Sequence, residues 1–181
     1  GPNGAGKSTT MKMITCFMAP SGGDIRANGA SVFDDPAQFK ARIGYLPEST
    51  PLYQDMFIID YLDFVARLQG VPASSIPERT KQMISYTGLE AEKHKKIGEL
   101  SKGFKQRVGL AQAMIHDPEV LILDEPTTGL DPNQIIEIRE LIKQLGREKT
   151  ILLSTHILPE VEAISDRILI INDGQITANG T

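Results

Sequence analysis

The sequence is poor in several features that mark particular classes of protein. Its 181 residues contain one cysteine, Cys16, and no tryptophan, and no apolar run approaches the roughly 18 residues that a membrane-spanning helix needs. A lone cysteine excludes an internal disulfide and fits a reducing compartment, and its neighbours predict a small apolar filler on a buried helix face. No basic-then-apolar leader opens the chain, so we expect any membrane role to come through a partner.

Positive charge is also scarce. There are 19 Lys and Arg against 23 Asp and Glu, which gives a net charge of -4 and argues against a basic surface built for nucleic acid. The basic run at 93–96 predicts a solvated helical end rather than a binding patch, because acidic residues flank it, namely Glu90, Glu92 and Glu99. His94 and His116 are interpreted as solvated or helix-end residues, not metal ligands.

What the sequence does contain is an alternation of strand-like and helix-like segments, which favours an α/β fold with a mainly parallel sheet and flanking helices. We expect one domain over 1–181, with a helical subdomain at about 51–118. Helices are expected at 8–18, 36–41, 56–70, 77–87, 101–116, from 131 onwards and at 160–164. Strands are expected within 24–32, at 42–46, 120–123 and 150–154, and in a hairpin over 167–178.

The chain opens on a phosphate-loop pattern, G-x-x-x-x-G-K-[ST], that leads directly into a predicted helix. Glycines let successive backbone N–H groups face an anion, the Lys7 ammonium can reach the β- and γ-phosphates, and the Ser8 hydroxyl is placed to bind Mg²⁺. The residues expected to hold the nucleotide here are Gly1, Asn3, Gly4, Ala5, Gly6, Lys7, Ser8 and Thr9.

A second candidate site follows the apolar segment 120–123, which is typical of a strand buried on both faces. Asp124 and Glu125 come at its carboxyl end, where parallel sheets place their ligands. Because adjacent strand residues point in different directions, Asp124 can hold Mg²⁺ while Glu125 polarises a water.

The third motif is the run Leu100-Ser101-Lys102-Gly103-Phe104-Lys105-Gln106-Arg107. Ser101 and Gly103 would offer a hydroxyl and bare N–H groups to an anion at a helix start, although Ser is also a preferred cap of any helix. The run resembles the LSxGxxQR signature of ABC (ATP-binding cassette) ATPases, and the order of the phosphate loop, the signature and the paired carboxylates is similar to that family over essentially the whole chain.

This resemblance implies a P-loop NTPase core with a helical signature subdomain, and ATP with Mg²⁺ held between two head-to-tail cassettes. Thr128-Gly129-Leu130-Asp131 resembles the D-loop, and Ser154-Thr155-His156 resembles the H-loop, whose His156 would contact the γ-phosphate. The segment 44–47 precedes the Q-loop position, where many relatives have Gln and this chain has Glu48. We expect Glu48 to lie near Mg²⁺ and to change the metal dependence.

The implied function is the ATP-hydrolysing subunit of a membrane ABC transporter, docked on a permease through about 48–70 at the inner face of the cell membrane. The segments 45–48 and 131–133 look similar to bacterial exporter-type cassettes, including those for drug export or gliding motility. A non-transport ABC ATPase of the translation or chromosome type, or a non-hydrolysing module, are the alternatives. The family would place a strand before Gly1, so we expect an N-terminally truncated domain that is unstable and inactive alone.

Overall fold

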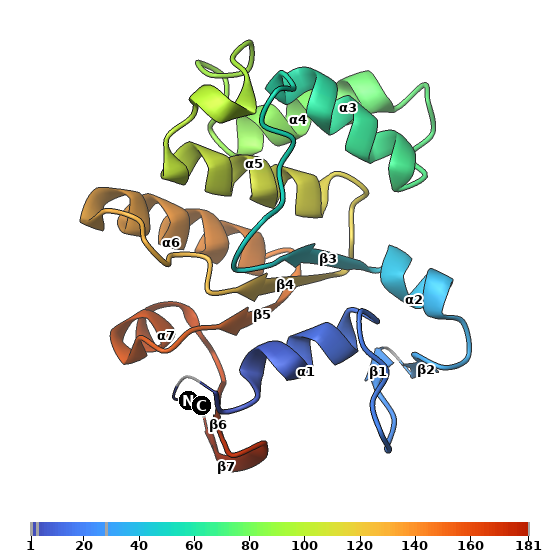
Figure 1. Ribbon diagram of the computed structural model, residues 1–181, viewed down its shortest axis with the longest axis vertical. Helices are drawn as coiled ribbons and strands as arrows, with labels where there is room; N and C mark the ends of the chain where they lie inside the picture. The colour runs from blue at the N-terminus through green and yellow to red at the C-terminus, as the bar shows by residue number, and fades with distance from the viewer. Residues whose placement is uncertain (1, 3, 28, 181) are drawn as a thin grey trace.

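The computed structural model describes residues 2, 4–27 and 29–180, and its elements follow the predicted alternation (Figure 1). The strands are β1 Arg26–Ala27, β2 Ala30–Ser31, β3 Ile43–Leu46, β4 Val120–Asp124, β5 Thr150–Ser154, β6 Ile168–Asn172 and β7 Gln175–Gly180. The helices are α1 Lys7–Ile14, α2 Pro36–Ala41, α3 Ile58–Leu68, α4 Ile76–Tyr86, α5 Lys102–Met114, α6 Pro132–Gly146 and α7 Leu158–Ile164, with a 3-10 turn at Ile97–Glu99.

The sheet at the centre has three parallel strands in the order β3-β4-β5. Val120 lies opposite Ile43 on one side and Thr150 on the other, so the carboxyl ends of the three strands meet at one edge. The pairs β1-β2 and β6-β7 are antiparallel. The predicted parallel core and the hairpin near the end of the chain are therefore confirmed.

Helices cover both faces of this sheet (Figure 1). Along β4 the side chains alternate, because Leu121 and Leu123 pack with α5 and α6, whereas Ile122 packs with Met11 of α1 and with Phe39. All three leucine and isoleucine side chains are fully buried. The prediction that this strand is buried on both faces is confirmed.

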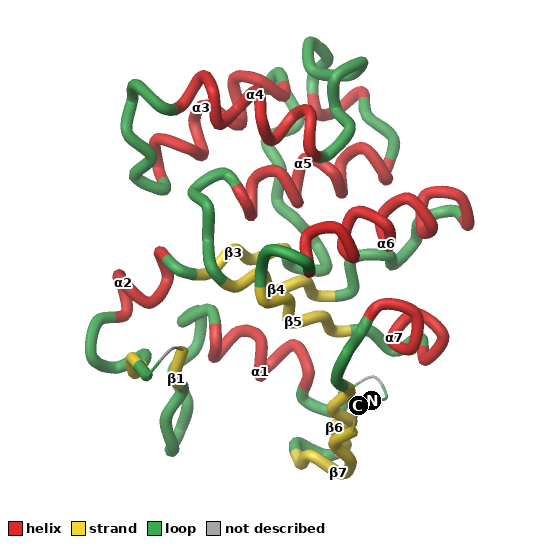
Figure 2. Tube along the Cα trace, turned by 180° about the vertical axis from the view of Figure 1, so that it is seen from behind, coloured by secondary structure: helices red, strands yellow, loops and turns green. Residues whose placement is uncertain are grey.

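The helices α3, α4 and α5 gather on one side of the sheet, where α5 contacts β3 directly and α3 and α4 pack against α5 (Figures 1 and 2). Apolar residues at helical spacing drive this packing, and Ile58, Leu62 and Ala66 of α3 are all fully buried. Arg79 of α4 donates from its guanidinium to the carbonyl oxygens of Met114 and Ile115 at 2.9 and 3.0 Å, so it satisfies the end of α5.

Two predictions about the first helix are wrong. The helix α1 ends at Ile14 rather than at residue 18, because the Thr15 and Cys16 N–H groups donate to the carbonyls of Met11 and Met13 and Cys16 then adopts a φ of 58°. Cys16 consequently lies outside the helix, half-buried, instead of on a buried helix face. Burial raises the pKa of its thiol.

The basic run at 93–96 lies mainly in a turn and ends at Lys96, the N-cap of the 3-10 turn at Ile97–Glu99, so it adjoins a short 3-10 helix rather than an α-helix, and its solvation is confirmed. The ammonium groups of Lys93 and Lys95 pair with the carboxylates of Glu90 and Glu92 at 3.0 and 2.7 Å. Exposed pairs of this kind contribute little to stability.

His116 follows α5 as predicted, but it is partly buried rather than fully solvated. Its ring is mostly buried, Nε2 lies 3.1 Å from the Ile43 carbonyl oxygen, and Nδ1 is buried without a hydrogen-bond partner among the described residues. Burial, together with the nearby charges of Arg79 and Lys149, lowers its pKa against the opposing effects of the Ile43 hydrogen bond and Asp117.

We therefore expect His116 to lower the free energy of unfolding as the pH decreases. Because the pKa of His116 is lowered in the folded state, the unfolded chain binds a proton at this ring more readily below about pH 6.5, and the stability present above that pH is lost as the pH falls. Urea unfolding of the full-length protein at pH 7.5 and 5.5 should show a decrease that is smaller in His116→Gln by up to about 1 kcal/mol. His94→Gln, at an exposed histidine, should behave as wild type, and equal decreases in all three proteins would contradict this account.

Candidate active site

The phosphate loop lies between the chain start and α1, in a backbone conformation that only glycine adopts readily. Gly4 and Gly6 have φ values of 80° and 103°, and Ala5 between them is buried. Among the described residues no side chain caps α1, and its first turn carries no acidic residue. The Lys7 Nζ donates to the Pro2 carbonyl at 3.0 Å. The loop therefore presents uncapped helix N–H groups and a cation, which suits an anionic ligand.

Asp124 is held where β4 and β5 end together. The strand register places Asp124 opposite Ser154, and the Ser154 hydroxyl donates to Asp124 Oδ1. Both side chains are buried, with 3 and 4% of their surface exposed. One carboxylate oxygen is thereby fixed by the neighbouring strand.

Glu125 turns out of the strand with a φ of 50°, in the left-handed region that is rarely used outside glycine. Its N–H donates to the Ser154 carbonyl at 3.0 Å, which anchors this conformation. Its carboxylate Oε2 lies 2.9 Å from His156 Nδ1 and 3.3 Å from the Thr128 hydroxyl. The carboxylate is buried, while the His156 side chain is 45% exposed, so the pair lies at the edge of the site.

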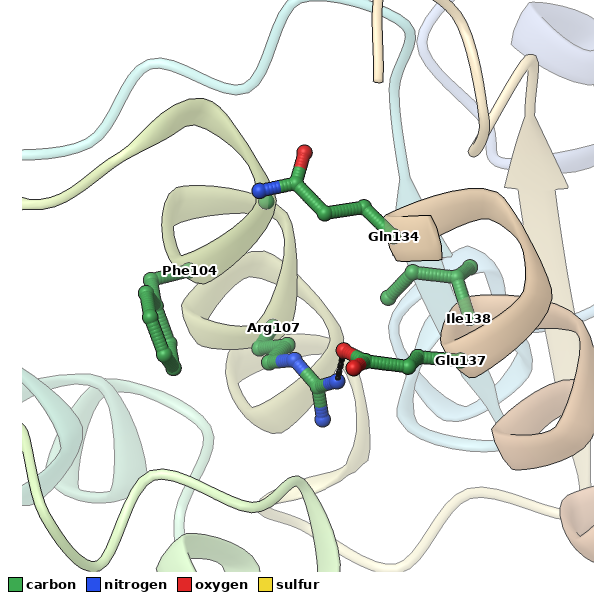
Figure 3. A pocket seen from close by; sticks show the side chains of 6 residues that line it. Phe104, Arg107, Gln134, Glu137 and Ile138 are labelled. Carbon is green, nitrogen blue, oxygen red and sulfur yellow. Dashed lines mark hydrogen bonds and ion pairs between the residues drawn. The ribbon is translucent and has the colours of Figure 1, made fainter. Parts of the chain in front are cut away.

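The signature run begins α5 and faces the start of α6. Ser101 is the N-cap of α5, with its Oγ accepting from the Phe104 N–H at 3.4 Å. Gly103 is buried against Gln134 of α6, because a Cβ at this position would lie 2.6 Å from the Gln134 amide. Figure 3 shows the Arg107 guanidinium pointing toward Glu137, to which it is paired at 2.5 Å.

Comparison with known proteins identifies the family. The sequence model of the family described as "ABC transporter" matches residues 1–128, and a shorter match to "AAA domain, putative AbiEii toxin, Type IV TA system" covers residues 96–161. The ABC transporter ATP-binding protein NatA of Bacillus subtilis (strain 168) is 40% identical over 182 residues, which cover 99% of this chain and 74% of NatA. The chain belongs to the ABC transporter family.

Other relatives agree. The uncharacterized ABC transporter ATP-binding protein YxlF of Bacillus subtilis (strain 168) is 38% identical, and this ABC chain spans 59% of its length, with 99% of the chain covered. The structure of cbiO1 from Clostridium perfringens, described as part of the ABC transporter complex cbiONQ, superposes with a TM-score of 0.89 at 30% identity, over 99% of this chain and 74% of that one. A second structure, an ATP binding subunit of an ABC transporter, gives a TM-score of 0.85 at 35% identity over 100% and 76% of the two chains.

The structure brings together three of the residues predicted for the site of this ABC protein. Asp124, Glu125 and His156 meet at the carboxyl ends of β4 and β5, while Glu48 is exposed shortly after the carboxyl end of β3. Among the described residues no group of three or more His, Cys, Asp or Glu is close enough to hold a metal, so the Mg²⁺ role of Glu48 with Ser8 and Asp124 stays a prediction. Gly1 and Asn3 lie outside the described residues.

The signature and D-loop residues of this ABC protein take part in helix capping. Ser101 caps α5, and Asp131 caps α6 by accepting from the Gln134 N–H at 3.0 Å. Both caps lie on exposed residues at helix N-termini. Capping by itself does not distinguish a nucleotide contact from an ordinary helix start.

The structure places around the site three residues to which the sequence alone assigns no role there. Ser154 holds Asp124, Thr128 contacts Glu125, and Gly174 of the β6-β7 turn donates to the phosphate loop. Ser154 and Thr128 belong to motifs that the sequence singles out, but their partners follow only from strand register and turn geometry. Nothing in the sequence points to Gly174 beyond its place in a turn.

Proposed function

We propose that this chain is the ATP-binding and hydrolysing part of an ABC transporter, acting as a single domain over 1–181 with a helical subdomain at about 51–118. The observation that carries the proposal is the Glu125 carboxylate, buried in the left-handed region of φ and contacted by His156 and Thr128 beside the fixed carboxylate of Asp124. A structural carboxylate would have little need of this arrangement, whereas a general base must be held in place.

ATP is proposed to bind with its phosphates on the loop of residues 1–9. Its polyphosphate would attract the Lys7 ammonium, which now contacts the Pro2 carbonyl. Glu125 would accept the proton of the attacking water, and His156, whose ring is partly exposed, would orient Glu125 and contact the γ-phosphate. Phosphoryl transfer depends mainly on positioning and charge stabilisation, which suits a site built from fixed donors and acceptors.

The residues present fit a Mg²⁺ ion. Ser8 lies in the first turn of α1, and the buried Asp124 carboxylate lies at the carboxyl end of β4, so these two residues would supply oxygen ligands to the ion. When bound, Mg²⁺ would offset the negative charge of the phosphates. Glu48 would add a carboxylate near this edge, and we propose that it alters the Mg²⁺ dependence from that of a glutamine.

A second cassette is proposed to complete the site. Ser101, Gly103 and Asp131 lie at the starts of α5 and α6, where the helix N–H groups can bind an anion presented by another subunit. ATP would thus be held between the loop of one cassette and the signature of the other.

A permease is the proposed second partner. On α3 and the loop before it, large apolar side chains are exposed: Tyr53 at 56%, Phe64 at 36% and Leu68 at 70%. The rings of Tyr53 and Phe64 lie 5.8 Å apart and form one surface, and such patches mark interaction sites. None of the helices in the described ranges is long and apolar enough to cross a bilayer. Through this apolar surface the chain is proposed to attach peripherally to a permease at the inner face of the membrane. The Nod factor export ATP-binding protein I of Burkholderia lata, at 39% identity, supports an exporter.

Dimer formation tests the shared site. In sedimentation experiments on the full-length Glu125→Gln protein, ATP with Mg²⁺ should convert monomer to dimer, because ATP persists without hydrolysis. Ser101→Arg should prevent dimerisation while leaving ATP binding within about twofold, since Ser101 would act on the partner's nucleotide. Ser74→Arg, at an exposed residue before α4, is the matched control and should dimerise. If the Glu125→Gln protein stayed monomeric at saturating ATP, the proposal of a site shared by two cassettes would be wrong.

A further inference from the structure

The turn between β6 and β7 touches the phosphate loop. The Gly174 N–H donates to the Ala5 carbonyl at 2.9 Å. The two backbones also approach closely, because a Cβ on Gly6 would lie 3.4 Å from the Gly174 Cα. Figures 1 and 2 show the hairpin beside the start of α1, although the hairpin follows the loop by most of the chain.

This N–H is available because of the type of turn. Asn172 pairs with Gln175, so Asp173 and Gly174 form a two-residue loop, and their φ values of 47° and 73° match a type I′ turn. In such a hairpin the residues flanking the loop exchange the ladder hydrogen bonds, so the central N–H of Gly174 points away from the strands. The phosphate loop supplies its acceptor.

Both backbone groups of Ala5 are now fixed. Its N–H donates to the Pro2 carbonyl at 3.3 Å, and its carbonyl accepts from Gly174. A trans peptide is planar, with the carbonyl and the following N–H pointing in opposite directions. Since the Ala5 carbonyl points at the hairpin, the Gly6 N–H must point away from it.

We propose that Gly174 is a positioning residue of the nucleotide site: by holding the Ala5 carbonyl it aims the Gly6 N–H at the bound phosphates. The inference rests on the proposed binding of ATP to this loop. If the loop were flexible, part of the binding free energy would be lost in ordering its N–H groups. The contact with the hairpin orients the Gly6 N–H before the nucleotide binds. The chemistry recognised is that of a nucleotide polyphosphate, so ATP and ADP should depend on Gly174 equally.

The test compares hairpin variants of the full-length protein by equilibrium binding of ATP and of ADP. Gly174→Val disfavours the positive φ and re-aims the N–H, so both dissociation constants should rise about tenfold, as expected for one charge-assisted hydrogen bond. Gly174→Asn, which tolerates the same φ and keeps the N–H, should restore binding to within about twofold of wild type. Gly174→Ala should raise both dissociation constants about threefold, between the effects of valine and asparagine. It tests the positioning role if the valine variant does not fold.

The matched control is Thr177→Val, which removes the 3.2 Å hydrogen bond from the Thr177 hydroxyl to the Ile170 carbonyl and weakens the hairpin away from its turn. It should lower the melting temperature without changing the dissociation constants. Unchanged binding in a folded Gly174→Val protein, or an equal loss in Thr177→Val, would overturn the positioning role. Wild-type protein that binds no ATP would instead overturn the proposed function.

Discussion

Replacing Glu125 by Gln is expected to lower kcat for ATP hydrolysis by about 10²- to 10⁴-fold, the usual contribution of general-base help. The amide has nearly the same shape as the carboxylate and can keep its contacts with His156 and Thr128, which lie 2.9 and 3.3 Å from Oε2. It cannot take a proton from water. ATP should therefore bind to the variant and remain intact, which phosphate release and equilibrium binding on the full-length protein would measure together.

The control for this variant is Glu140→Gln. Glu140 lies on the exposed face of α6, where its carboxylate pairs with Lys143 at 3.5 Å, so removing its charge should leave kcat within about twofold. If Glu125→Gln kept kcat within about threefold of wild type, Glu125 would be a structural carboxylate and another base would be required.

The backbone conformation of Glu125 supports the expectation that Glu125→Gln lowers kcat strongly. A non-glycine residue at a φ of 50° costs about 1–3 kcal/mol and persists only where the surroundings fix it. Here the strand β5 fixes it, because the Glu125 N–H donates to the Ser154 carbonyl at 3.0 Å. The same serine holds Asp124, so one residue positions both candidate carboxylates.

The sequence predicts those parts of the fold that local signals determine. The helix α2 was predicted at 36–41 and lies there; the structure shows that the Asp35 carboxylate caps it by accepting from the Ala37 and Gln38 N–H groups, with proline in the first turn. The strand β5 was predicted at 150–154 and has these bounds in the structure. Patterns spanning a few residues are sufficient for such elements.

The remainder depends on contacts that no local pattern encodes. The sequence could not predict the end of α1, because a cysteine takes the left-handed conformation that glycine usually supplies. Nor could it pair Ser154 with Asp124 or Gly174 with Ala5, since the partners lie 30 or more residues apart and meet only through strand register and hairpin placement. Both missed contacts fix groups of the candidate site, so motifs can name its candidate residues, whereas the hydrogen bonds that position them follow only from the fold.

The second large effect concerns the strand that carries the carboxylates. Leu121→Ala in β4 should lower the free energy of unfolding by about 2–5 kcal/mol, because the substitution loses buried methyl groups and leaves a cavity. Leu121 is 0% exposed, and its Cδ1 lies 2.9 Å from where a Cβ of Gly44 on β3 would be, so neighbouring strands are already in close contact around it. Domains are typically stable by only about 5–15 kcal/mol, so the loss should be a large fraction of the total.

Urea unfolding of the full-length protein, followed by circular dichroism, would measure this change. Ile136→Ala on α6 is the matched control, since Ile136 is 57% exposed and should lose less than about 1 kcal/mol. Because Leu121 faces α5 and α6, its loss should act on the packing of those helices against β4 and so on the distance between the signature and the paired carboxylates. Equal losses in the two variants would mean that β4 is not the centre of the cooperative core, and that the site is held chiefly by its own hydrogen bonds.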